Sequence, residues 1–117
     1  MWTYLNGEFI PKEEVRISPF DRGFLFGDSV YEVIPSYNNK LFLFDEHLER
    51  LRNSLSITNI TIPESLKDLH PLMMELLKKN KFSNQAIYIQ ITRGVDPVRS
   101  HVSARTTVPT LFMSSAE

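Results

Sequence analysis

β-Branched and aromatic residues cluster at Val30, Tyr31, Val33 and Ile34, and this run predicts a β-strand in a chain that stays extended as far as Tyr37. Successive side chains of a strand point to opposite sides of the sheet, so the strand has two distinct faces. One face carries Val30, Glu32 and Ile34, and the other carries Ser29, Tyr31 and Val33. A turn containing Gly23 and Gly27 leads into the strand. Pro35 has no amide hydrogen to donate to a neighbouring strand, which favours an edge position or a bulge.

Two hairpins are predicted around this strand. Asn6-Gly7 favours a type I′ turn and joins short extended segments over residues 2–5 and 8–10. Asn38-Asn39 reverses the chain, which returns as an extended segment over residues 41–44. The N-terminal third of the chain is therefore expected to form antiparallel strands.

A helical period follows these strands. Leucines recur at i, i+3 and i+7 from Leu48, and Asp45 is the predicted N-cap of a helix that ends near Ser56. A second stripe with the same spacing consists of His47, Arg50 and Ser54. Packing and polar chemistry are thus predicted on different sides of this helix.

A second helix is predicted after Pro63, with apolar residues at helical spacing as far as Leu77. Pro71 lies inside this pattern. Its missing amide and its ring would cost about 3 kcal/mol in a straight helix, so a kink or a break is expected near His70.

Two further strands are predicted over residues 87–92 and 108–113, with a polar loop between them. Isoleucines alternate with polar residues in the first of these strands, which gives it one apolar face. This order of elements predicts an α+β fold, in which two main helices pack on an antiparallel β-sheet.

Composition and charge limit the classes of protein to which this chain can belong. The chain has 117 residues, of which 42% are hydrophobic and 23% charged, so one globular domain is expected. A formal net charge of −1 and the lack of a large basic cluster argue against a nucleic-acid partner. The absence of cysteine excludes disulfides and thiol nucleophiles. No apolar run approaches the roughly 20 residues of a membrane span, so a soluble, cytoplasmic protein is predicted.

Arg99 and His101 form the most informative polar pair, because side chains at i and i+2 of an extended loop can both reach one site. The planar guanidinium of arginine is well suited to bind a carboxylate. Taken alone, such a pair is more often a solvated part of a loop. Other chemistry finds little support, since the three histidines show no metal-ligand spacing and neither a G-x-S-x-G nor a P-loop motif occurs.

Three motifs occur in order along the chain. They are R-G-F-L-F-G-D-S-V-Y-E-V from Arg22, F-x-x-H-x-x-R-L from Phe44 and Q-x-T-R-G from Gln90. Together they resemble the N-terminal half of the class IV (fold type IV) pyridoxal-phosphate aminotransferases, and within that class the D-amino-acid aminotransferases most of all. The resemblance covers essentially the whole chain and implies that residues 1–117 form the small N-terminal domain of that fold.

The resemblance also implies roles for particular residues. In the D-amino-acid enzymes an Arg-x-His pair, lent by the partner subunit of a homodimer, and a tyrosine hold the substrate α-carboxylate. The arginine of the H-x-x-R-L motif reaches the phosphate of pyridoxal phosphate. The expected substrate-binding residues are therefore Tyr31, Val33, Arg99 and His101, and the expected cofactor-binding residues are Arg50 and His47. Each also has a plain structural interpretation, such as a packed strand residue or a surface arginine.

A pyridoxal-phosphate aminotransferase needs a lysine that binds the cofactor covalently and moves a proton. The lysines of this chain lie in predicted turns or on helix surfaces: Lys12, Lys40, Lys67, Lys78, Lys79 and Lys81. In the family the cofactor lysine belongs to a second domain. The chain is therefore interpreted as a domain that is inactive alone and that serves, in the complete enzyme, the transfer of an amino group from a D-amino acid to 2-oxoglutarate.

Two alternatives stay open at this point. A branched-chain L-amino-acid aminotransferase or an aminodeoxychorismate lyase shares the first two motifs, and the Arg99-x-His101 pair is what favours the D-specific type. A non-catalytic binding or dimerisation module is the other alternative, because the lysine domain is missing. A large exposed apolar face would favour a domain that is normally covered over a free-standing module.

Overall fold

The computed structural model describes residues 1–62, 65–102 and 107–117. Its strands are β1 (Trp2–Leu5), β2 (Glu8–Pro11), β3 (Ser29–Tyr37), β4 (Lys40–Leu41), β5 (Asn84–Thr92) and β6 (Thr110–Ala116). Its helices are α1 (Arg22–Phe26), α2 (Phe44–Thr58) and α3 (Leu69–Asn80), with the 3-10 turns η1 (Lys12–Glu14) and η2 (Leu66–Asp68). Pro63 and part of the polar loop after Arg99 lie outside the described residues.

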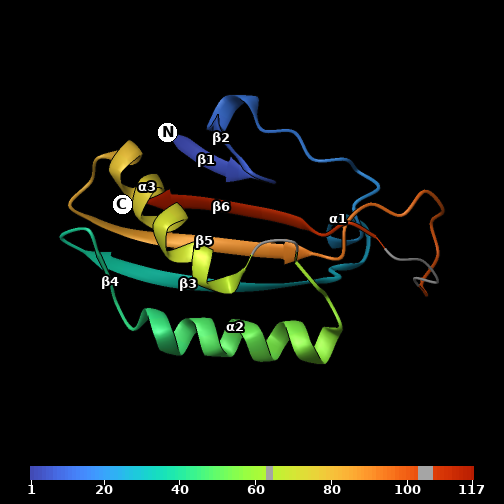
Figure 1. Cartoon of the computed structure of the whole chain (residues 1–117). Helices are drawn as coiled ribbons and strands as arrows, with labels where there is room; N and C mark the ends of the chain where they lie inside the picture. The colour runs from blue at the N-terminus through green and yellow to red at the C-terminus, as the bar shows by residue number, and fades with distance from the viewer. Residues whose placement is uncertain (63–64, 103–106) are drawn as a thin grey trace.

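The strands form one antiparallel sheet in the order β2-β1-β6-β5-β3-β4, and α2 and α3 pack on one of its faces (Figure 1). This two-layer arrangement confirms the predicted α+β class. The segment of residues 93–102 that follows β5 projects beyond the sheet at the end where α1 lies (Figure 1).

The hydrophobic core lies between the helices and this face of the sheet. The predicted alternation is confirmed in β3, where Val30 and Ile34 are buried and Tyr31 and Val33 are exposed. The isoleucines of β5 are fully buried, and the leucine stripe of α2 belongs to the same core cluster. Burial of these aliphatic side chains is the main favourable contribution to folding, at about 1.5–3 kcal/mol for each.

Pro35 lies at an edge, as predicted. On one side β3 pairs with β5 along its whole length, whereas on the other side, within the described residues, β4 pairs with it at Ser36 and Tyr37. The proline ring therefore interrupts no ladder between two long strands.

The start of α2 differs from the prediction. The second arm of the hairpin ends at Leu41, and Leu43 takes a left-handed conformation with φ 53° that turns the chain into the helix. The carbonyl of Leu43 accepts from the amide of His47 at 3.0 Å, so the cap position lies before Asp45. The prediction of Asp45 as N-cap was wrong. Its carboxylate lies in the first turn, where it complements the positive end of the helix dipole.

The break expected near His70 is found where η2 ends and α3 begins, at Asp68 and Leu69. Pro71 then falls in the first turn of α3, where its missing amide would have had no partner within the helix. The helix therefore starts late enough to accommodate the proline without a kink.

The predicted glycine-containing turn holds a short helix instead. The Asp21 carboxylate accepts from the amide of Gly23 at 2.8 Å and caps α1, and Gly27 ends the helix with φ 65°. A Cβ on Gly23 would lie 2.4 Å from the Cγ2 of Thr92, so glycine allows α1 to sit directly against the end of β5. This contact fixes the position of α1 relative to the sheet.

Candidate functional site

The six residues predicted to bind substrate or cofactor lie in three groups. His47 and Arg50 stand on α2 beside β3. Tyr31 and Val33 lie on the sheet face that the helices leave open. Arg99 and His101 lie in the loop after β5, against α1.

Glu32 organises the first group. It projects from β3 toward α2, and its side chain is 5% exposed. Its Oε1 lies 2.8 Å from the Nδ1 of His47, and its two oxygens accept from the Nε and Nη2 of Arg50, each at 2.9 Å. Burial alone would raise the pKa of Glu32, but the hydrogen bonds from Arg50 and His47 and their charges outweigh it, so the pKa lies below its usual range. The carboxylate is therefore ionised at neutral pH and holds both side chains.

Sequence reasoning missed Glu32 as a member of the site. The signal was present, because the alternation placed this one carboxylate on the apolar face of the strand, opposite the stripe of α2 that carries His47 and Arg50. A buried carboxylate requires partners, and the polar stripe supplied them.

The guanidinium of Arg50 is free to bind a second anion. Its side chain is 67% exposed, and among the described residues its Nη1 has no hydrogen-bond partner, because Glu32 occupies Nε and Nη2. The hydrogen bond to Glu32 and the charge of that carboxylate raise the pKa of Arg50, with a small contribution from Tyr31. The first two groups are thus close enough to interact electrostatically at the outer edge of β3.

The Glu32 cluster predicts a pH dependence of stability. The pKa of Glu32 is lower in the folded state, so the unfolded state binds more protons near pH 4, and stability falls as the pH drops below the unfolded pKa of about 4.3. Urea unfolding between pH 3 and pH 7 should show a shallower loss of stability for Glu32→Gln than for the wild type. Equal pH profiles for the two proteins would contradict this assignment.

Tyr31 begins a chain of contacts across the open face. Its ring, 62% exposed, stacks on Tyr88 with 5.8 Å between centroids. The Tyr88 hydroxyl donates to Gln90 at 2.8 Å, and the Gln90 amide donates to the hydroxyl of Ser29 at 2.9 Å. Burial, with a smaller effect of Tyr31, raises the pKa of Tyr88, so its hydroxyl stays protonated at neutral pH. Val33 lies beside Tyr31 on this face and is 44% exposed.

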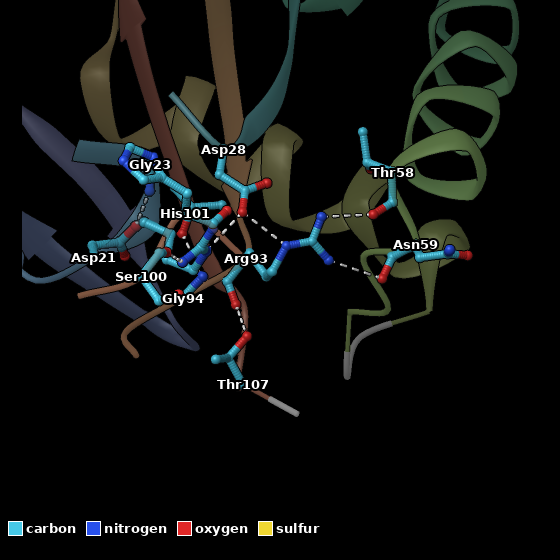
Figure 2. A network of polar contacts seen from close by, with 12 residues as sticks. Asp21, Gly23, Asp28, Thr58, Asn59, Arg93, Gly94, Ser100, His101 and Thr107 are labelled. Carbon is cyan, nitrogen blue, oxygen red and sulfur yellow. Dashed lines mark hydrogen bonds and ion pairs between the residues drawn. The ribbon is translucent and has the colours of Figure 1, made fainter. Parts of the chain in front are cut away.

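Asp28 and Arg93 connect the third group to the rest of the molecule (Figure 2). The Nε of Arg93 donates to Asp28 at 2.8 Å, and its Nη2 donates to the carbonyl of Thr58 at 2.7 Å, so this side chain ties the end of α2 to the start of β3. The carboxylate of Asp28 also accepts from the Nε of Arg22 at 2.9 Å. Burial opposes ionisation, but the hydrogen bonds from the two arginines and their charges lower the pKa of Asp28.

The arrangement leaves the predicted carboxylate-binding residues in two places. Tyr31 contacts Tyr88, whereas Arg99 and His101 contact Phe26 of α1 at the end of the molecule. Among the described residues, no cluster of histidine and carboxylate side chains is suited to hold a metal ion. In the same part of the chain no helix is long and apolar enough to cross a membrane.

Comparison with known proteins gives a consistent set of relatives. The family described as amino-transferase class IV matches residues 29–117. A D-alanine aminotransferase of Staphylococcus haemolyticus is 41% identical over 115 residues, which cover 98% of this chain and 40% of that protein. A D-alanine aminotransferase of Listeria monocytogenes is 37% identical over 102 residues, or 87% of this chain and 35% of that protein. The chain therefore spans 35–40% of the length of these curated relatives.

Solved structures show the same fold. The branched-chain amino acid aminotransferase of Escherichia coli superimposes with a TM-score of 0.89 at 21% identity, over 98% of this chain and 39% of that chain. The branched-chain aminotransferase of Thermoproteus uzoniensis, solved with norvaline, gives a TM-score of 0.86 at 22% identity, over 99% of this chain and 40% of that chain. The family match over residues 29–117 and the curated relatives carry the assignment that the sequence motifs predicted. The chain belongs to the class IV aminotransferase family.

Proposed function

We propose that this chain is the N-terminal domain of a pyridoxal-phosphate-dependent D-amino-acid aminotransferase, in which it binds the cofactor phosphate and the substrate carboxylate. The observation that carries the proposal is the exposed guanidinium of Arg50, held by Glu32 with its Nη1 directed to no described partner. The similarity to D-alanine aminotransferases supports the choice within the family.

The donor groups of the site fit the cofactor. A guanidinium offers a planar pair of donors to a dianionic phosphate, and Glu32 orients Arg50 while His47 braces the same carboxylate. When bound, pyridoxal phosphate supplies the electron sink for the transfer of the amino group. Glu32, Arg50 and His47 therefore serve to hold the phosphate end and not to move the proton.

The substrate carboxylate is assigned to Tyr31, Arg99 and His101. We infer, from the resemblance to the D-amino-acid enzymes, that the loop of one subunit serves the site of its partner in a homodimer. In keeping with this, Arg99 and His101 contact Phe26 at one end of the molecule, whereas Tyr31 contacts Tyr88 on the open face. Val33 would line the side-chain pocket next to Tyr31. We place this homodimer in the cytoplasm, in keeping with a chain that has no cysteine.

Activity requires a chain that also carries the cofactor lysine. For these tests, 'the complete enzyme' means a fusion protein. It joins this chain to the part of the Staphylococcus haemolyticus D-alanine aminotransferase that this chain does not match. In the complete enzyme Arg99→Ala should raise the KM for D-alanine by about 10- to 100-fold, since it removes charge-assisted hydrogen bonds worth roughly 1.5–3 kcal/mol.

The matched control is Arg52→Ala, which removes an exposed arginine that pairs with Glu49 on α2. It should leave the KM unchanged. An unchanged KM in Arg99→Ala would contradict the carboxylate assignment. Turnover of L-leucine in place of D-alanine would favour the branched-chain alternative, and the absence of both activities would favour a non-catalytic module.

The 117-residue chain alone should not catalyse the transfer. Incubation with pyridoxal phosphate and reduction with borohydride should give scattered lysyl adducts or none by mass analysis, and no turnover of D-alanine with 2-oxoglutarate. A single lysyl adduct together with turnover would show that one of the chain's own lysines carries the cofactor.

A further inference from the structure

The helix α1 holds the backbone of the loop that follows Arg99. Arg22 is 4% exposed, and its side chain reaches across from α1 to the loop. Its Nη1 donates to the carbonyl of Ser100 at 2.6 Å, and its Nη2 donates to the carbonyl of His101 at 3.1 Å. The fork of one buried guanidinium thus binds two consecutive peptide groups, while Asp28 accepts from its Nε at 2.9 Å. Arg22 therefore holds the loop backbone at His101 itself and at Ser100, the residue that follows Arg99.

The ring of Phe26, at the other end of α1, contacts the side chains themselves. The guanidinium carbon of Arg99 lies 5.1 Å from the ring centroid, and the imidazole of His101 lies 5.1 Å from it, tilted by 55°. The guanidinium carbon of Arg22 lies 4.8 Å from the same centroid. The ring of Phe26 therefore contacts the side chains of two arginines and one histidine. The negative face of an aromatic ring attracts a cation in this way.

The helix α1, which carries Phe26, is firmly attached to the sheet. Asp21 is fully buried; it caps α1 and also accepts from the hydroxyl of Thr110 on β6 at 2.6 Å. Gly23 allows α1 to touch Thr92 of β5. Because α1 is held at these points on the sheet, Phe26 offers a fixed surface to the loop.

We propose that Phe26 is a positioning residue that holds Arg99 and His101 in the geometry in which they receive a carboxylate. This inference rests on the proposed function, because it concerns the orientation of the pair that the substrate meets. The binding groups belong to a loop, and loops hold side chains less accurately than helices and strands do. The ring of Phe26, supported by α1, restricts the side chains of Arg99 and His101. This restriction favours carboxylate binding, because binding is tighter when the groups that bind already have the required geometry.

The contact can be tested in the 117-residue chain with trypsin, which cleaves after Arg99. Mass analysis would measure the rate of cleavage between Arg99 and Ser100 under native conditions. This cleavage rate reports how often the loop opens. Phe26→Leu should raise this rate about tenfold through the loss of the cation–π contacts. Phe26→Tyr keeps the aromatic face and should restore the wild-type rate.

Phe24→Leu is the matched control, because Phe24 belongs to the same short helix and is 74% exposed. It should cleave at the wild-type rate. Equal rates in Phe26→Leu and the wild type would overturn the inference. Equal acceleration in Phe24→Leu would overturn it as well, because the effect would then reflect a general loosening of α1.

The complete enzyme separates this inference from the proposed function. Phe26→Leu should raise the KM for D-alanine about tenfold with little change in kcat, and Phe26→Tyr should restore it. A KM that rises in Arg99→Ala but not in Phe26→Leu would overturn the positioning role and leave the carboxylate assignment standing. A KM that changes in neither variant would overturn the carboxylate assignment, while the trypsin rates would still decide whether Phe26 holds the loop.

Discussion

Replacing Gly94 with alanine is expected to lower the free energy of unfolding by about 3–5 kcal/mol, because a left-handed backbone and a steric clash coincide there. Gly94 has φ +100°, and a Cβ would lie 1.9 Å from the carbonyl oxygen of Val108. That oxygen belongs to backbone leading into β6 and cannot rotate away as a side chain could. The carbonyl of Gly94 also accepts from the amide of Arg22 at 2.9 Å, so any shift would disturb α1 as well.

Gly7 provides the control for this substitution. It has nearly the same backbone conformation, with φ +99°, but nothing lies within 4 Å of a Cβ built there. Gly7→Ala should therefore cost only the conformational penalty, about 1–2 kcal/mol. Urea unfolding of both variants would measure the difference. Equal losses in the two variants would show that the close approach of Val108 contributes nothing.

Replacing Asp21 with alanine is expected to destabilise the domain by about 2–4 kcal/mol, since it leaves one buried and one partly buried donor without an acceptor. The amide of Gly23 and the hydroxyl of Thr110 both donate to this fully buried carboxylate, at 2.8 and 2.6 Å. The loss of an N-cap adds to the cost. Thermal or urea unfolding would measure the effect.

Asp21→Asn is the matched control, because it changes the charge of the side chain and preserves its size. It keeps one side-chain oxygen and should be less damaging than Asp21→Ala, provided that this oxygen still faces the amide of Gly23. If alanine and asparagine cost the same, the hydrogen bonds to the carboxylate do not stabilise α1 and the effect must have another origin.

Periodicity predicted the parts of the fold that depend on burial. The leucine stripe of α2 was confirmed because burial against the sheet selects apolar residues at helical spacing, and the two faces of β3 were confirmed because successive side chains of a strand point to opposite sides. The ends of elements were less accurate. The start of α2 depends on the left-handed backbone of Leu43, a conformation that nothing in that side chain favours.

The sequence predicted individual residues of the candidate site but not the contacts between them. Spacing along α2 placed His47 and Arg50 on one stripe, yet their common partner Glu32 comes from a strand 15 residues before the histidine. The contact of Phe26 with Arg99 joins α1 to a loop that follows β5, more than 70 residues later in the chain. Contacts of this kind depend on tertiary structure, and no local pattern encodes them.

The strand order has a consequence for biosynthesis. β6 lies between β1 and β5, so the strand that joins the N-terminal hairpin to the rest of the sheet is the last of the six to be translated. Thr3 pairs with Ser114, and these partners can meet only after β6 has left the ribosome. Such distant pairing slows folding, and until then the edges of β1 and β5 are unpaired and open to association. The nascent chain is thus most prone to edge-to-edge association in the interval before β6 emerges.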